Sequence, residues 1–364
     1  MQETGSLLTC KNASVPSPEL PNYAERRTQD GTQYFFGRHK RCPSDTAVTN
    51  SVLTVPVFGN QAGEPCNNAA GFASSWCYQA YRWNLDYVVD PHGNSMTYVW
   101  SKLTGRYGLN GNTAAVLYDL SASLDHIDYG TRAGSEAGGS APARVVFATA
   151  GRCSGACVIP TDYPDTPWDL YCATTATSCP GLLSPTFFNP NRLASVTALV
   201  WNPASLAYRN VDQWVLTHTF PPSGDNIPPA GNDTSPNLWL DSLTHTGFAA
   251  DGSSLAEPAV HFGGTAMANM VDWGANIGVS PYAHYRLTSI VNGMGGQTLV
   301  EYSTVECPRP DAQAELRRQR VPVLPAVLHA DPGTGRVRLV QQVRGDQGDR
   351  VGSDRRRPGR DLDL

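Results

Sequence analysis

The sequence has 364 residues with a formal net charge of −5, and charged residues make up only 16% of it. This length is enough for one large hydrophobic core or for two ordinary domains. The net negative charge gives no general field that would attract nucleic acid or an anionic membrane, so we expect neither as a partner. The 34 Gly, 28 Pro, 15 Tyr and 8 Trp are typical of short strands separated by turns.

The first part of the chain, 1–29, is rich in Pro, Ser and Asn, and we expect it to be a poorly structured opening segment. It has neither the basic residues nor the apolar run of a signal peptide, so a signal, if the protein is exported, is expected outside this chain. No later stretch approaches the length of a membrane span. From Asp30 to Gly37 a turn leads into large β-forming residues, and an extended apolar run covers Val52–Phe58.

The densest run of β-forming residues is Trp83–Trp100, which is interrupted by the turn residues Asp90, Pro91, Gly93 and Asn94 and therefore predicts a β-hairpin. No window of twelve or more residues has an apolar period of 3.6, so any helices should be few and short. The sequence thus predicts an all-β protein. Further strand-like runs lie at 143–150, 195–202, 212–220, 237–246, 259–264 and 284–303, the last with a hairpin tip at 293–296. Polar, glycine-rich segments at 131–144 and 221–236 predict exposed loops.

Most of the nine cysteines form close pairs, which are Cys66 with Cys77, Cys153 with Cys157, and Cys172 with Cys179. Short spacings within loops suit local disulfides, and these persist in an oxidising compartment. Structural zinc is the alternative, but the gaps within the last two pairs differ from the two-residue spacing of zinc knuckles. We therefore expect three disulfides and a secreted or cell-surface protein.

The tail, 308–364, contains no Phe, Tyr or Trp and holds about half of all the arginines. Such a tail is ordinarily a disordered arm for nucleic acid or another partner. If it is back-translated with GC-rich codons and read one nucleotide later, however, two stretches gain aromatic and β-branched residues, and a cysteine falls at Val323 as a partner for Cys307. Our hypothesis is that the native frame is lost near Cys307 and that 308–364 is frameshifted and disordered.

The octapeptide Tyr87–Asn94, YVVDPHGN, follows the pattern Y-x-x-D-x-x-G-[NR]. Here Asp90 can cap the turn with its side chain, Gly93 can supply a positive φ, and the flanking aromatic residues can pair across strands. With this octapeptide, the ordered series of segments over 30–307 resembles the YD-repeat or RHS-repeat proteins of actinobacteria, at the N-terminal part of the repeat region. That series is VPVFGNQAGEPC, SWCYQAYRWNLDYVVDPHGNSMTYVW, LDHIDYGTR, YPDTPWDLYC, SPTFFNPNRLASVT, VDQWVLTHTFP, LWLDSLTHTG and YRLTSIVNGMGGQTLVEYS.

The resemblance implies a large, curved and spiralling sheet of consecutive antiparallel hairpins. In longer relatives this sheet closes into a hollow shell around a C-terminal toxic domain. The chain would then be a non-catalytic shell segment, and its partners would be the remainder of a longer polypeptide or a toxin cargo. It lacks the long run of tandem repeats, the self-cleavage signature and the toxin domain of those relatives. Tyr87, Asp90, Gly93 and Asn94 are the repeat-type turn residues that the resemblance implies.

No G-x-S-x-G, H-E-x-x-H, P-loop, EF-hand or G-x-G-x-x-G motif is present, so we predict no catalytic, cofactor-binding or metal-binding residues. His92 is better explained as a solvated turn residue than as a base. Asp165 and Asp169 could form the acid/base pair of a glycosidase, but a disulfide-pinned loop anchored by Trp168 explains them better.

Two groups of side chains leave other functions open. His218, His245, His261 and His284 are scattered over four strand-like segments, and an unknown register could bring some of them together. The large aromatic side chains, which we expect to pack between sheet layers, are Trp76, Trp83, Trp100, Trp214 and Trp239. The alternatives to a shell segment are a surface adhesin that binds cell-surface glycan and a secreted β-fold glycoside hydrolase.

Overall fold

The computed structural model describes residues 24–40, 47–111, 114–136, 139–224, 235–268 and 283–302, together with the backbone of 327–330 and 336–340. Most of the expected opening segment and tail, including Cys307 and Val323, lies outside these ranges. Two compact units divide the chain. The first comprises 1–223, 235–262 and 292–295, and the second comprises 224–234, 263–291 and 296–364.

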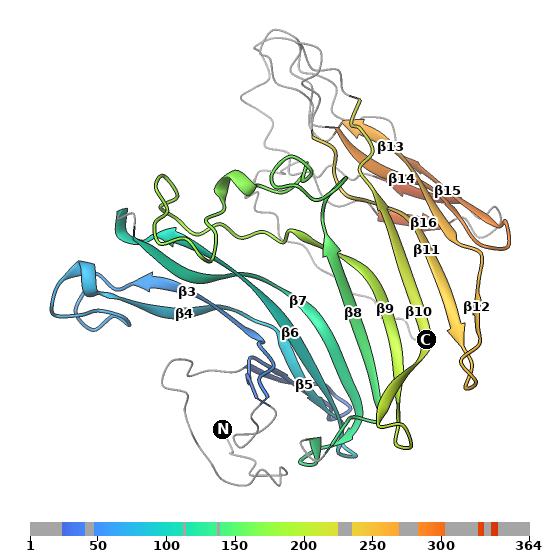
Figure 1. Cartoon of the computed structure of the whole chain (residues 1–364), viewed down its shortest axis with the longest axis horizontal. Helices are drawn as coiled ribbons and strands as arrows, with labels where there is room; N and C mark the ends of the chain where they lie inside the picture. Colours follow the sequence, from blue (N-terminus) through green and yellow to red (C-terminus); the bar gives the residue numbers. More distant parts are fainter. Residues whose placement is uncertain are drawn as a thin grey trace, which may run out of the picture. The chain divides into compact units, whose positions relative to one another are not determined.

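The first unit is built on one sheet in the order β1-β2-β5-β6-β7-β8-β9-β10-β11, and every pairing in it is antiparallel. Figure 1 shows strands β5 to β11 side by side. Their bounds are β1 Ala24–Arg27, β2 Gln33–Phe36, β5 Leu85–Val89, β6 Asn94–Gly108, β7 Ala115–Arg132, β8 Ala143–Gly151, β9 Asn191–Asn202, β10 Ala207–Thr219 and β11 Trp239–Phe248. Each strand from β5 to β11 pairs with the next one in the chain, so the predicted all-β fold of consecutive hairpins is confirmed. The sheet is open, and β1 lies at its edge.

The hairpin of β3 (Val52–Phe58) and β4 (Trp76–Trp83) interrupts this order and forms a two-stranded sheet of its own. It lies against β6 and β7, where the hydrophobic core is concentrated (Figure 1). The buried residues of this core are Tyr107, Leu109, Tyr118 and Leu120, and the partly buried side chains packed against them are Val55, Phe58, Trp76, Leu103, Val116, Tyr171 and Phe188. The last two come from the long β8–β9 connection, so this connection and the β3–β4 hairpin together cover part of the sheet.

Elsewhere the sheet is thinly covered. The expected packing of tryptophans between sheet layers holds for Trp76, which packs against the core, but not for Trp83, Trp100 and Trp239. Every residue of β9 is only partly buried, and 43% of Trp83 is exposed. Trp100 and Trp239 are partly exposed and donate their indole N–H to the C=O of Leu85 and Phe262, at 2.9 and 3.0 Å. These rings flank a single sheet and keep a polar edge in contact with it.

The outer edge of β11 carries two short pairings. β12 (Ser254–Ala256) and the first residues of β13 (Val260–Ala268) both pair with it in antiparallel fashion. In the second unit, β14 (Ala283–Val291) and β15 (Gln297–Tyr302) form the hairpin predicted for 284–303. In the tail, β17 (Arg336–Val340) pairs in parallel with β15 and in antiparallel fashion with β16 (Val327–Ala330). The proposed boundaries 1–29, 30–307 and 308–364, and the frameshift, stay predictions.

The sequence missed one long element and misjudged one loop. Strand β7 pairs with β6 from Gly108 opposite Ala115 to Asn94 opposite Arg132, although its Ser-Ala-Ser centre breaks the apolar pattern. The segment expected to be an exposed loop at 131–144 starts inside β7 and buries the side chain of Glu136, which is 5% exposed. The helices described in full are single 3-10 turns at Phe72–Ser74, Leu109–Gly111 and Trp168–Leu170.

Candidate functional site

The YD-type octapeptide forms the turn between β5 and β6. The N–H of Asp90 donates to the C=O of Asn94, and the N–H of Gly93 donates to the C=O of Asp90, both at 3.0 Å. Gly93 has a φ of 78°, which glycine adopts without a steric penalty. The Asp90 carboxylate accepts the backbone N–H groups of His92 and Asn94 at 2.9 and 2.8 Å, and the Asn94 side-chain amide at 2.6 Å. These bonds, that of the Asn94 amide first, lower the pKa of Asp90.

Tyr87 is the buried end of the same octapeptide and is only 2% exposed. Its hydroxyl donates to Glu136 Oε1 at 2.6 Å, and Glu136 Oε2 accepts the N–H of Gly134 at 2.8 Å. Burial is the main reason why the pKa of Tyr87 is raised. Tyr87 pairs with Thr97 across the hairpin, and on its other side it lies opposite Phe35 on β2 with the two ring centroids 5.7 Å apart, so its aromatic cross-strand pair joins β5 to β2.

The loops on both sides of the turn contact it. Behind it, the N–H of Ala133 donates to the C=O of Gly93 at 3.0 Å, and the Arg132 guanidinium donates to the C=O of His92 at 2.9 Å. Ahead of it, Gly31 in the β1–β2 turn approaches Pro91 so closely that a Cβ there would lie 3.1 Å from Pro91 Cγ. The octapeptide turn therefore contacts the β1–β2 turn on one side and the β7–β8 loop on the other.

The same backbone turn recurs in two other hairpins, at Thr28–Thr32 and Ala249–Ser253. In both, the first N–H donates to the fifth C=O and the N–H of the fourth residue, a glycine, donates to the first C=O. The φ of that glycine is 88° and 89°. The third residue, Asp30 or Asp251, accepts the N–H of the fifth residue at 3.1 and 2.9 Å. The repeated unit is thus a five-residue turn with a carboxylate cap. Its sequence is D-x-x-G-N at Asp90–Asn94, whereas the other two turns contain D-G-[ST].

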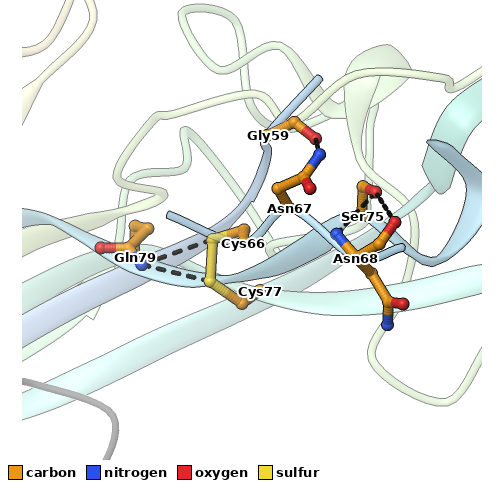
Figure 2. The surroundings of a disulfide bond; sticks show 7 residues. All are labelled: Gly59, Cys66, Asn67, Asn68, Ser75, Cys77 and Gln79. Atoms are coloured by element: carbon orange, nitrogen blue, oxygen red, sulfur yellow. Dashed lines mark hydrogen bonds between the residues drawn. A yellow bond between two sulfur atoms is a disulfide. The ribbon is translucent and has the colours of Figure 1, made fainter. Parts of the chain in front are cut away.

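Three disulfides join the cysteine pairs Cys66–Cys77, Cys153–Cys157 and Cys172–Cys179. Figure 2 shows the first of them, at the end of the β3–β4 hairpin, with the Gln79 amide donating to both sulfur atoms at 3.4 and 3.1 Å. Next to it, the Asn67 side chain donates to the C=O of Gly59 at 3.2 Å. The disulfide and these hydrogen bonds stabilise the loop between β3 and β4, which contributes few residues to the core.

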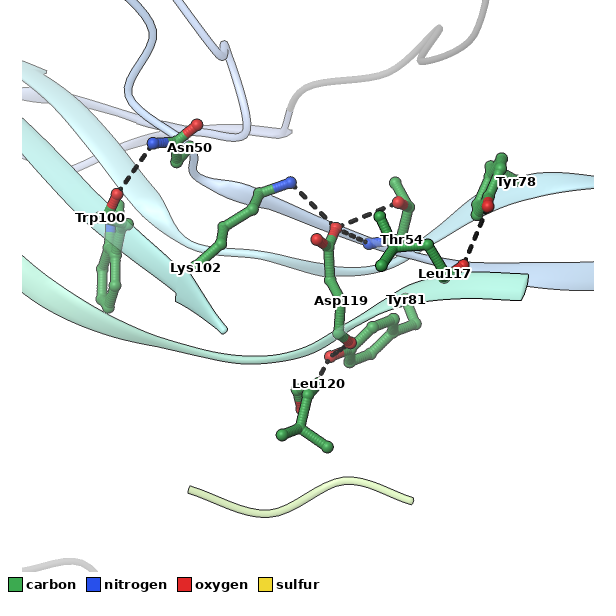
Figure 3. A network of polar contacts seen from close by, with 9 residues as sticks. All are labelled: Asn50, Thr54, Tyr78, Tyr81, Trp100, Lys102, Leu117, Asp119 and Leu120. Atoms are coloured by element: carbon green, nitrogen blue, oxygen red, sulfur yellow. Dashed lines mark hydrogen bonds and ion pairs between the residues drawn. The ribbon is translucent and has the colours of Figure 1, made fainter. Parts of the chain in front are cut away.

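A polar cluster attaches the β3–β4 hairpin to the main sheet (Figure 3). Asp119 Oδ2 on β7 accepts three donors, the Thr54 N–H at 2.7 Å, the Thr54 hydroxyl at 3.0 Å and the Lys102 ammonium at 2.9 Å. The hydroxyls of Tyr81 and Tyr78 donate to the C=O groups of Asp119 and Leu117, at 2.7 and 2.9 Å. Sequence reasoning missed this cluster because its members come from four strands.

A second buried carboxylate lies at the base of the same hairpin. Asp86 is fully buried, and its Oδ2 accepts the His39 N–H at 2.8 Å and the hydroxyls of Thr49 and Ser51 at 2.9 and 2.7 Å. Burial raises the pKa of Asp86, and the three donors oppose this effect. The three donors connect the chain around His39, the start of β3, and β5.

The carboxylates considered for glycoside hydrolysis are arranged differently from an acid/base pair. The Asp165 side chain is 5% exposed, and it forms a bidentate ion pair with Arg152, with N–O distances of 2.8 and 2.6 Å. Its Oδ2 also accepts the N–H of Leu238 at 2.9 Å, whereas Asp169 is exposed. Asp165 therefore links the β8–β9 connection to the start of β11.

The four histidines lie on four different strands. His218 lies opposite Leu240 and His245 opposite Trp214 on the β10–β11 pair, His261 is on β13, and His284 is on β14 of the second unit. His92 is exposed in the turn. Among the described residues, no three His, Cys, Asp or Glu side chains form a group that could bind a metal ion. In the same ranges, no helix has the length and apolar character that crossing a membrane requires.

These features define an all-β protein of consecutive antiparallel hairpins with carboxylate-capped turns. No protein-family model matches its sequence, and neither does any curated protein. Solved structures to which part of this chain is similar include the crystal structure of TcdB2-TccC3-TEV, with 13% identity, a TM-score of 0.32 and coverage of 66% of this chain and 11% of that chain. The crystal structure of TcdB2-TccC3-Cdc42 has 13% identity and a TM-score of 0.30, over 70% of this chain and 13% of that one.

A third structure to which part of this chain is similar is the N-terminal domain of the effector protein SpvB from Salmonella typhimurium strain LT2. It has 14% identity and a TM-score of 0.26, over 65% of this chain and 68% of that domain. This chain spans about a tenth of the length of the two TcdB2-TccC3 chains. Likeness at this level assigns no function, so the functional argument depends on the features of the chain itself.

Proposed function

We propose that this chain is a non-catalytic structural segment of a secreted YD/RHS-repeat protein, and that its sheet forms part of a wall around a C-terminal toxin or effector. The observation that carries the proposal is the Tyr87–Asn94 turn, which combines the repeat pattern with contacts to the turns before and after it. A unit that contacts both neighbouring turns suits a sheet extended by repetition. Three disulfides favour an oxidising, extracellular location.

The thin cover of the sheet agrees with this role. A sheet with partly exposed residues on β9 and β10 needs another surface to bury its apolar side chains. In a wall, that surface would be the remainder of the polypeptide or its cargo. Two buried carboxylates have structural partners: Asp165 is paired with Arg152, and Asp119 is bonded to Lys102 and Thr54.

The test has two arms. First, the complete reading frame that contains this chain is expressed and imaged by cryo-electron microscopy, with protease digestion in parallel. We expect residues 24–302 in the wall of a particle, and polypeptide from the same reading frame inside it, cut at least about tenfold more slowly than after denaturation. Downstream polypeptide that is cut equally fast in both states would contradict the proposal.

The second arm separates the alternatives. The purified chain is applied to a glycan array and incubated with polysaccharide substrates, and we expect neither binding nor hydrolysis. Specific glycan binding by a soluble monomer would replace the proposal with a surface adhesin. Hydrolysis that is lost in D165N or D169N would replace it with a glycoside hydrolase.

A further inference from the structure

One histidine in the open part of the sheet has both ring nitrogens directed at carboxylates. His245 on β11 has its Nε2 2.9 Å from Asp212 Oδ1 on β10 and its Nδ1 3.3 Å from Glu257 Oε2, just after β12. Its ring stacks on Trp214, with the ring centroids 5.0 Å apart and the planes 19° from parallel. The stack fixes the plane of the imidazole and thereby keeps both nitrogens aimed at oxygen atoms.

This geometry distinguishes the two protonation states of His245. A neutral imidazole donates from one nitrogen only, and its other nitrogen would then present a lone pair to a carboxylate. Only the imidazolium donates to both carboxylates. The two nitrogens lie on different sides of the ring and do not converge on one point, so the arrangement is not a metal site.

The charged groups around His245 come from each neighbouring element. Strand β10 provides Asp212, and the segment after β12 provides Glu257. On β13, His261 lies opposite Ser242, which precedes His245 by three residues on β11. The other charged residue of β11 is Asp241, near the first residue of the strand. Within the described ranges, His245 is the only cation in an ion pair with Asp212 or Glu257.

The cluster lies at a break in the backbone pairing along β11. β12 pairs with Thr246–Phe248, and β13 pairs with Ser242 and Leu243 on the same edge. Between them comes Pro258, which has no N–H to donate. The Glu257 N–H donates to the C=O of His245 at 2.8 Å, and the Glu257 carboxylate meets the ring of the same residue. Side-chain bonds thus reinforce the last backbone bond of the β11–β12 pairing, just before Pro258.

We propose that Asp212, His245 and Glu257 form a proton-dependent clasp that holds β12 on the edge of β11 and weakens when His245 loses its proton. The proposal does not depend on the proposed function. Deprotonation leaves two carboxylates beside a neutral ring and loosens β12, so that residues Thr246–Phe248 become an unpaired edge open to another strand.

The direction of the pH dependence follows from the ion pairs. The hydrogen bond to Asp212, followed by that to Glu257, raises the pKa of His245 above its ordinary value of 6.5. A group whose pKa is raised on folding stabilises the folded state fully below its unfolded pKa, and this contribution is lost as the pH rises through the raised value. The clasp is therefore closed in mildly acidic solution and weakened in alkaline solution.

Hydrogen exchange measured by mass spectrometry on the full chain tests the clasp. The readout is the protection of the 253–260 peptide, normalised to the intrinsic exchange rate, at about pH 6 and about pH 9. We expect protection to fall about two- to fivefold from the lower to the higher pH, which corresponds to the free energy of an exposed ion pair. In H245Q, protection should be low and the same at both pH values, and E257Q should give a smaller fall than the wild type.

His126 provides the matched control, because its ring nitrogens also face two carboxylates, Asp125 and Asp128. There, Asp128 is already paired with Arg144 at 2.6 Å. H126Q should therefore keep the wild-type pH profile of the 253–260 peptide. Equal protection at both pH values in the wild type, or a wild-type profile in both H245Q and E257Q, would overturn the proposal.

Discussion

The sheet has a covered region and an open region, and they are held together in different ways. In the covered region, β6 and β7 pack against the β3–β4 hairpin and the β8–β9 connection, with a buried core and the carboxylates Asp86 and Asp119 fully or nearly buried. In the open region, β9 and β10 have only partly buried or exposed residues. Their contacts are cross-strand pairs such as Trp214 on His245.

The difference indicates where stability resides. Burial of apolar surface and bonds to buried charges contribute most of the free energy of folding, and both are concentrated in the covered region. Exposed ion pairs and partly exposed strands contribute little each. Substitutions of the same chemical type should therefore have unequal effects in the two regions.

The largest effect is expected at Asp119. In D119A, the Lys102 ammonium, the Thr54 N–H and the Thr54 hydroxyl lose the oxygen that accepts all three. Because the Asp119 side chain is 10% exposed and that of Lys102 24% exposed, we expect the free energy of unfolding to fall by about 3 kcal/mol. Urea unfolding followed by tryptophan fluorescence measures it.

K102M is the control for this prediction. It removes the cation but leaves the carboxylate with both donors of Thr54, so its loss should be smaller than that of D119A. A D119A protein as stable as the wild type would show that the cluster in Figure 3 does not hold the β3–β4 hairpin.

A matched pair of valines compares the two regions directly. Val52 on β3 is 1% exposed and Val215 on β10 is 40% exposed. We expect V52A to lower the free energy of unfolding by about 2 kcal/mol, because it leaves a cavity. V215A should lower the free energy of unfolding by about 0.5 kcal/mol, because the methyl groups of Val215 are already partly exposed to water. Similar losses in the two variants would mean that the open region is covered in solution.

The contrast between local and distant contacts explains what the sequence could predict. The strands, the β5–β6 and β14–β15 hairpins and the all-β class follow from alternation and turn residues within short windows. The bonds of Asp90 span four residues and can be anticipated in the same way. The partners of Asp119, Tyr87 and His245 depend on the register of strands far apart in sequence, which no local pattern specifies.

A single hydroxyl tests the connection between the repeat-type turn and the β7–β8 loop. Y87F removes the donor to Glu136 Oε1 and leaves a buried carboxylate oxygen without that bond, so we expect a loss of about 1.5 kcal/mol. Y98F is the matched control, because within the described ranges the Tyr98 hydroxyl forms no hydrogen bond. Chemical denaturation gives both values, and equal losses would contradict a specific Tyr87–Glu136 bond.

The smallest effect is expected at the turn itself, and it should depend on pH. Because bonds to Asn94 and His92 lower the pKa of Asp90 below 3.8, its contribution to stability is present above that value and lost as the pH falls through the lowered pKa. D90N keeps an acceptor for the His92 and Asn94 N–H groups but has no charge to titrate.

D90N should therefore open its turn modestly faster than the wild type at neutral pH, because it loses the charge and the bond from the Asn94 amide, whereas D90A should exchange its turn amides faster still. Hydrogen exchange of the 90–95 segment between about pH 3 and about pH 6 measures this. Stronger acid-dependent opening in the wild type than in D90N would assign the titration to Asp90. Identical profiles would place the acid sensitivity of the turn elsewhere and leave its backbone bonds and Gly93 as the features that form it.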